Sequence, residues 1–197
     1  MSFETNLRAA GQAIATVRFV CAFGAANKPS DVNKNRMATG SRPSMTTVLD
    51  ILLVNEYDRL GAEGQTRALR IPIDAALGRQ FHTGTCETQA SVAFEFLQGL
   101  GTPRPIDFMT NNNDTHAFVV IGRSGAATNW TDWGADAVVC DPWLNASPNV
   151  SVDGAGASSD AWPFRPAAWA ACDLVLGAQT PRKLSSYTFK SEYQVTA

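Results

Sequence analysis

The spacing of apolar residues changes about halfway along this 197-residue chain, and this change constrains the fold more than any other feature. In residues 1–98, apolar side chains recur at three- and four-residue steps, the repeat of an amphipathic helix. Beyond residue 115, short runs of β-branched and aromatic residues are typical of strands. Helices followed by strands predict an α+β fold, with N-terminal helices packed on an antiparallel sheet. A mass of 21.1 kDa fits one domain over residues 1–197.

Three helices are expected in the first half of the chain. The first has an apolar face and ends near Gly24. The second covers residues 47–60 and begins with a weak capping box. The third covers residues 86–98 and follows a Pro-containing segment at residues 71–77.

Strands are expected in the second half. Residues 116–121 and 137–141 are β-rich runs bounded by Gly, Asn or Pro. Further strand content is expected at residues 174–176 and 186–195, where Lys190 and Glu192 indicate a face in solvent.

Two long connections interrupt these elements. Residues 27–43 carry basic side chains among Asn, Ser, Gly and Pro, and we expect a mobile loop there. Residues 144–166 contain a Gly/Ala/Ser-rich piece and are expected to form a long surface loop or a lid. Because that connection exceeds the usual loop length, we expect it to be functional.

Charge and composition exclude several classes of function. Sixteen basic against eighteen acidic residues give a net charge of −2, which predicts neither nucleic-acid binding nor attraction to an anionic membrane. The longest apolar stretch, residues 13–26, is interrupted by Arg18 and is too short to span a membrane. Glu4 stands where a signal peptide would be basic. The four scattered cysteines are expected to be free thiols, and no cofactor is expected.

Cys86 is the candidate nucleophile. It follows Gly84 and Thr85 and opens a helix, where unpaired backbone N–H groups and the helix dipole favour the thiolate. Glu87 opposes the thiolate by like-charge repulsion, so a nearby imidazolium is needed. His116 is the leading candidate for that group.

Asp141 is the candidate that orients His116. If the two strands form an antiparallel pair with residue 121 opposite 136, residue 116 lies opposite 141, and the two side chains meet at one edge of the sheet. There the carboxylate can accept the ring N–H and fix the tautomer. Pro142 cannot continue the ladder, which leaves Asp141 at a strand end.

The attack of a thiolate on an amide creates an oxyanion that needs hydrogen-bond donors. The backbone N–H of Cys86 is one predicted donor, because it lies at the start of its helix. The side chain of Gln80, six residues upstream, is the second.

These residues resemble those of papain-like thiol hydrolases, which use Cys, His and Asn or Asp in this chain order with the cysteine at a helix start. The upstream Gln also matches the papain spacing. The strings GTCETQA (84–90), HAFVVI (116–121) and VCDPW (139–143) resemble more closely those of bacterial toxin and effector domains. Several of these domains are glutamine deamidases, including the catalytic domain of the Pasteurella mitogenic toxin, and others are proteases.

The resemblance covers residues 80–145 and implies a papain-like fold and a catalytic triad. Cys86 is then the nucleophile, His116 the general base and Asp141 the orienting residue. It also implies a monomeric bacterial protein, secreted or delivered into a target cell without a recognisable signal peptide, that acts on a protein substrate.

Each candidate also has a simpler interpretation. His82, four residues before Cys86, is an alternative base. On the simpler interpretation, Asp141 is an ordinary turn residue before a proline. The other cysteines, at positions 21, 140 and 172, are interpreted as small buried hydrophobes. Trp143 is kept as a wall of the substrate site, whereas Trp130, Trp133, Trp162, Phe164 and Trp169 are interpreted as packing residues.

The leading function is deamidation of protein glutamine side chains by a cysteine-dependent amidohydrolase. A cysteine protease performs the same chemistry on a backbone amide, and a transglutaminase replaces water with an amine. A zinc site built from His82, Cys86, His116 and Cys140 or Asp141 is an alternative, although the spacing matches no zinc module and no metal is expected. A non-catalytic interaction module on the same scaffold is the third class.

Overall fold

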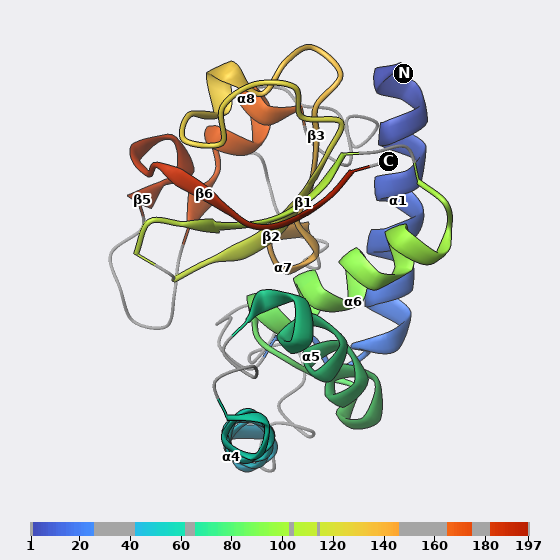
Figure 1. Ribbon diagram of the computed structural model, residues 1–197, viewed down its shortest axis with the longest axis vertical. Helices are drawn as coiled ribbons and strands as arrows, with labels where there is room; N and C mark the ends of the chain where they lie inside the picture. The colour runs from blue at the N-terminus through green and yellow to red at the C-terminus, as the bar shows by residue number, and fades with distance from the viewer. Residues whose placement is uncertain are drawn as a thin grey trace.

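The computed structural model describes residues 2–25, 42–61, 66–102, 105–113, 115–145, 165–174 and 182–196. The helices are α1 (Phe3–Val20), α4 (Arg42–Leu60), α5 (Arg67–Phe81), α6 (Cys86–Gly99), α7 (Pro142–Asn145) and α8 (Pro166–Ala170), with 3-10 helices η2 (Trp130–Asp132) and η4 (Leu184–Ser186). The strands are β1 (Ile106–Asn111), β2 (Ala117–Ile121), β3 (Val138–Cys140), β4 (Asp173–Leu174), β5 (Arg182–Lys183) and β6 (Phe189–Val195). Figure 1 shows α1 and α6 to the right of a curved sheet, α5 and α4 below it, and α8 above it.

The main sheet has four antiparallel strands in the order β3-β2-β1-β6. The two central strands are buried throughout, so both faces of the sheet are covered. β6 lies at one edge, where Lys190 and Glu192 form an ion pair of 2.7 Å and remain partly exposed, as the sequence predicts. β4 and β5 form a separate two-stranded ribbon.

One face of the sheet packs against α1 and α6, which lie side by side (Figure 1). Alternate strand residues such as Val119 and Cys140 contribute to this first core, together with the apolar faces of the two helices. The alternation follows from the two-residue period of a strand, which sends neighbouring side chains to opposite faces.

The other face carries an aromatic core. Phe118, Trp133, Trp169 and Phe189 are buried there and contact one another with ring centroids 4.5–6.1 Å apart. Cys86 belongs to this second core although the rest of α6 belongs to the first. The N-terminus of α6 therefore reaches toward the face of the sheet that its body does not cover.

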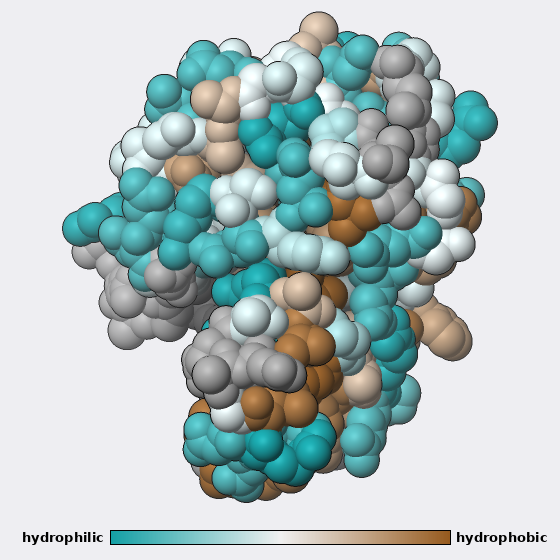
Figure 2. Space-filling view, in the orientation of Figure 1, coloured by the Kyte–Doolittle hydropathy of each residue, from teal (hydrophilic) through white to brown (hydrophobic). Residues whose placement is uncertain are grey.

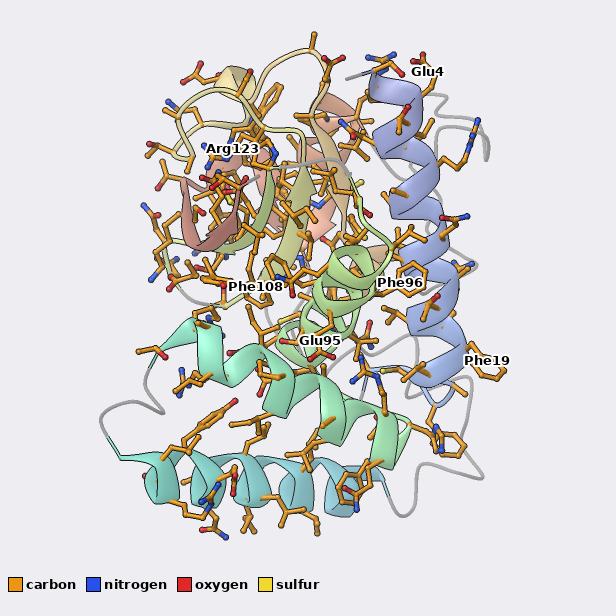
Figure 3. The ribbon with its side chains drawn as sticks, turned by 45° about the vertical axis from the view of Figure 1, so that its right-hand side comes forward. Glu4, Phe19, Glu95, Phe96, Phe108 and Arg123 are labelled. Atoms are coloured by element: carbon orange, nitrogen blue, oxygen red, sulfur yellow. The ribbon has the colours of Figure 1, made fainter. Side chains whose placement is uncertain are left out.

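The helices α4 and α5 extend the molecule away from the sheet. Figure 3 shows α4 across the far end, beneath α5. Glu95 of α6 pairs with Arg79 of α5 at 2.5 Å, which joins α5 to the main body. The outer side of α4 leaves Val48, Ile51 and Val54 exposed, and Figure 2 shows brown surface around these helices.

A buried carboxyl group lies where α4, α5 and α6 meet. Asp74 of α5 accepts hydrogen bonds from the Tyr57 hydroxyl of α4 and, at 3.4 Å, from the Ser91 hydroxyl of α6. Burial, and secondarily the charge of Glu87, raise the pKa of Asp74 to about 7. Asp74 is therefore protonated over part of the near-neutral range.

The α+β class and the antiparallel sheet are confirmed, and the three expected helices correspond to α1, α4 and α6. Two elements are additional. The segment 71–77 is the centre of α5, with Pro72 inside the helix at an exposed position, and β1 lies at residues where no strand was expected.

The two expected long connections lie mostly outside the described residues. At their described ends, the first is shorter than predicted because α4 already begins at Arg42. The second is shorter at both ends, since residues 144 and 145 belong to α7 and Pro166 begins α8. None of the described helices is long and apolar enough to cross a membrane.

Candidate active site

Cys86 is the first residue of α6, as predicted. Thr85 precedes it in an extended conformation, and the backbone of Gly84 lies against the side chain of Thr88. A Cβ on Gly84 would overlap the side chain of Thr88, so only glycine fits. Cys86 is 7% exposed, and its thiol donates to the carbonyl of Thr115 over 3.9 Å.

His116 immediately precedes β2, and a side chain from the end of β1 holds its backbone. Oδ1 of Asn111 accepts the N–H of Thr115 at 2.8 Å and that of His116 at 3.2 Å. The Asn111 amide also donates to the Thr115 hydroxyl at 2.8 Å. This buried amide fixes the turn that carries both the imidazole and the carbonyl facing Cys86.

Asp141 follows β3 directly, and its carboxylate is fully buried. Oδ2 lies 2.7 Å from Nε2 of His116 and also accepts the indole N–H of Trp169 at 2.9 Å. Oδ1 accepts the backbone N–H of Leu144 at 3.0 Å. Three donors from three separate segments therefore converge on one carboxylate.

The predicted strand pairing is wrong by two residues, although its consequence survives. Val119 lies opposite Cys140 and Ile121 opposite Val138, whereas Ile121 was expected opposite Asp136. The carbonyl of Asp136 instead accepts a hydrogen bond from Asn6 of α1 at 2.8 Å. A two-residue shift keeps every side chain on its predicted face, so the side chains of residues 116 and 141 still meet.

The imidazole has a different neighbour at each nitrogen. Nε2 carries the proton, because the carboxylate beside it can only accept. Nδ1 is buried and has no hydrogen bond of ordinary geometry within the described ranges. Cys86 nevertheless acts on the ring by hydrogen bonding and charge. With Nε2 committed to Asp141, Nδ1 is the atom that the sulfur can engage.

The electrostatics of the pair favour an imidazolium beside a carboxylate. Burial by itself lowers the pKa of His116, but the charge and hydrogen bond of Asp141, with smaller contributions from Cys86, outweigh it and raise the pKa to about 10. Burial by itself raises the pKa of Asp141, but His116, Trp169 and the Leu144 N–H hold it below its ordinary value. Both groups are therefore charged at neutral pH.

Aromatic rings enclose the imidazole. Phe118 stacks on it with centroids 5.9 Å apart, and Trp143 meets it edge-on at 5.3 Å. Trp143 was predicted as a wall of the substrate site, but its side chain is 1% exposed and contacts His116 instead. The rings exclude water, which strengthens the interaction between the charges inside.

Glu87, expected to oppose the thiolate, has a partner. Its carboxylate forms an ion pair with Arg67 of α5. The guanidinium also lies over the ring of Phe108, 4.9 Å from the centroid. This pairing offsets much of the negative charge next to Cys86.

The structure does not bring Gln80 to the triad. It lies on the exposed side of α5, one residue before the helix ends, and no hydrogen bond joins its amide to the triad within the described part of the chain. The Cys86 backbone N–H is at the first position of α6, where N–H groups lack intrahelical partners, and remains a candidate oxyanion donor.

His82, the alternative base, has a structural role. It ends α5 in the left-handed conformation at φ 53°, and its Nδ1 lies 2.9 Å from the carbonyl of Val20 in α1. The structure does not bring the ligands of the alternative zinc site together. The thiol of Cys140 points to the carbonyl of Ala10, on the opposite face of the sheet. Among the described residues, no group of three or more His, Cys, Asp or Glu side chains is arranged to hold a metal ion.

The other three cysteines are buried, as expected. Burial, opposed by the charge of Arg79, raises the pKa of Cys21 to about 12. Burial and the charge of Asp141 raise the pKa of Cys140 still further. Cys172 donates to the carbonyl of Ala168 at 3.5 Å. None of these thiols acts on the imidazole.

Two residues of the site were missed in the sequence. Trp169 was interpreted as packing, and no local signal links it to Asp141, 28 residues away. Asn111 had a usable signal, because an Asn that opens a turn commonly hydrogen-bonds to backbone N–H groups further along that turn.

Comparison of the chain with known protein families, with curated proteins and with solved structures finds no match.

Proposed function

We propose that this protein is a papain-like, cysteine-dependent amide hydrolase that deamidates glutamine side chains of a protein substrate. The observation that carries the proposal is the buried His116–Asp141 pair, 2.7 Å apart, with Cys86 acting on the same imidazole. A buried imidazole whose pKa is raised by a carboxylate and a thiol is unusual outside catalytic sites. The residue order and the toxin-like strings of the sequence support the same class.

In the first half of the reaction, the Cys86 sulfur attacks the carboxamide carbon of the substrate. The imidazolium of His116 protonates the leaving nitrogen, the C–N bond breaks, ammonia departs and a thioester remains. In the second half, His116 removes a proton from water, which attacks the thioester and releases glutamate and the thiol. Asp141 keeps the Nε2 proton in place in both steps.

The oxyanion of each tetrahedral intermediate lies near the sulfur, at the N-terminus of α6. The backbone N–H of Cys86 supplies one donor there, and the positive end of the helix dipole adds to it. The ion pair between Glu87 and Arg67 limits the opposing negative charge.

Access to the site favours a side-chain amide over a backbone amide. All three triad residues are buried, and Cys86, at 7%, is the most exposed of them. A carboxamide at the end of a flexible glutamine side chain reaches a recessed sulfur more readily than a main-chain bond does. The toxin-like strings support delivery of such an enzyme to another cell.

Mass spectrometry of a target-cell lysate tests the proposal. Wild-type protein should convert glutamine to glutamate in a limited set of proteins, and Cys86→Ala should not. Cys172→Ala is the matched control, because it removes another buried thiol and should retain activity.

The other outcomes contradict the proposal in distinct ways. New chain termini would indicate a protease, and amine-linked products a transglutaminase. A Cys86 that iodoacetamide modifies no faster than Cys21, Cys140 and Cys172 would indicate a non-catalytic module.

A further inference from the structure

Trp169 has an interaction that packing alone does not require. It lies in α8, is fully buried, and belongs to the aromatic core with Trp133 and Phe118. These ring contacts involve the carbon framework of the indole and do not by themselves supply a partner for its N–H. The indole N–H points to Oδ2 of Asp141 at 2.9 Å.

The acceptor atom is the one that also faces His116. Oδ2 takes both the imidazole N–H and the indole N–H, while Oδ1 takes the backbone N–H of Leu144. Donors on both oxygens prevent the carboxylate from rotating about its Cβ–Cγ bond. The indole bond therefore fixes the orientation of the atom that fixes the imidazole.

We propose that Trp169 is a positioning residue of the triad, whose indole N–H keeps Asp141 anionic and the shared proton on Nε2 of His116. The inference rests on the proposed function, because it assigns a role within that triad. It also makes α8, which begins 26 residues after the end of β3, a required part of the site.

The chemical reason is competition for electron density on one oxygen. A carboxylate oxygen that accepts a second hydrogen bond is a weaker base toward the first donor. With the indole present, the proton between His116 and Asp141 stays on Nε2, which leaves Nδ1 as the nitrogen available to the Cys86 sulfur. Without it, Oδ2 draws the proton closer, and the pKa of both partners should rise.

The test uses the fact that the chain contains two histidines, so a ¹⁵N-histidine NMR spectrum is simple to assign with a His82→Gln variant. Trp169→Phe keeps the aromatic packing but removes the donor. Trp133→Phe is the matched control, because Trp133 is also buried in this core but donates to the carbonyl of Ala127 at 3.0 Å.

In Trp169→Phe, the titration midpoint of His116 should rise by about half a pH unit or more. Trp133→Phe should leave this midpoint unchanged. The titratable groups acting on the imidazole are Asp141 and Cys86, and neither is altered by these variants. An unchanged His116 midpoint in Trp169→Phe, or an equal shift in both variants, would overturn the inference.

A measurement on the wild type covers the case in which Trp169→Phe does not fold. The indole N–H signal of Trp169 should move with the titration of His116, whereas that of Trp133 should not. A Trp169 signal that stays constant would overturn the inference. Because neither measurement needs substrate, a protein that passes them yet deamidates nothing refutes the proposed function alone.

Discussion

Replacing Asp141 with alanine removes the acceptor for three buried donors and the charge that stabilises the imidazolium. The donors are the side chains of His116 and Trp169 and the backbone N–H of Leu144. Removing one partner of a buried ion pair generally costs about 3–5 kcal/mol, because the other charge is left unpaired. The variant should therefore lose a large part of its stability and yet remain folded at moderate temperature.

The effect on the imidazole can be given a direction and a size. In the wild type, burial lowers the pKa of His116, and Asp141 raises it to about 10 against an ordinary value of 6.5. Without Asp141, burial dominates, and the pKa should fall below 6.5. His116 is then neutral at pH 7, and Cys86 loses the imidazolium that stabilises its thiolate. Alkylation of Cys86 at pH 7 should slow by about 100-fold or more.

The pH dependence follows from the same shifts. The pKa of His116 rises on folding. Its full contribution to the free energy of unfolding is therefore present below 6.5, the pKa in the unfolded chain, and is lost as the pH rises toward 10. The pKa of Asp141 falls on folding. Its full contribution to the free energy of unfolding is therefore present above 3.8, the pKa in the unfolded chain, and is lost on acidification. The stability deficit of Asp141→Ala should therefore be largest between these unfolded values and shrink at alkaline pH.

Three measurements check this prediction: urea unfolding at a series of pH values, NMR titration of His116, and the alkylation rate of Cys86. Asp141→Asn is the informative companion. Its amide oxygen can serve the two donors on Oδ2, but its NH₂ then faces the Leu144 N–H, so its losses should be intermediate. A His116 that still titrates well above its ordinary pKa in Asp141→Ala, with Cys86 reacting at the wild-type rate, would refute the reasoning.

Three further substitutions test the surroundings of the triad. Arg67→Gln should leave the charge of Glu87 uncompensated and slow alkylation of Cys86 several-fold at low salt, with the effect fading as salt is added; faster alkylation would contradict the electrostatic account. In the wild type, the free energy of unfolding should fall by at most about 4 kcal/mol between about pH 4 and pH 7, because folded Asp74 retains a proton that the unfolded chain has lost. Asp74→Asn should flatten this fall. An unchanged slope in urea unfolding would show that Asp74 does not cause it. Gly84→Ala should lower the free energy of unfolding by about 1–3 kcal/mol and also slow Cys86 alkylation, because the new methyl group overlaps a side chain one turn into α6; a variant with wild-type thermal stability would mean that the turn has room.

Local patterns were sufficient where an element carries its own signal. The apolar repeat of residues 86–98 predicts α6 closely, and the position of Cys86 at its start follows from the turn residues before it. The chain order of Cys86, His116 and Asp141 indicates a triad even though the assumed register was wrong. An error of two residues was harmless because side chains on a strand alternate.

Elements without a clear local signal were missed. Pro72 masks the helical pattern of α5, although an exposed proline removes only one backbone hydrogen bond. The strand β1 contains Asp107 and Thr110 among apolar residues, and that acidic residue is buried because Arg123 and two β6 side chains surround it. Those partners come from β6 and from the loop that follows β2, so the residues near Asp107 in the sequence give no sign of them.

The sequence by itself determined the α+β class, the helix that presents Cys86, and the identity of the His and Asp that accompany it, because periodicity, capping and strand ends depend on neighbouring residues. Only the tertiary structure decided that Asp141 accepts the indole of Trp169, that Arg67 pairs with Glu87, and that Gln80 and His82 lie apart from the triad. These outcomes depend on how separate elements pack, and distances between groups far apart in the chain are set by that packing and not by any local pattern.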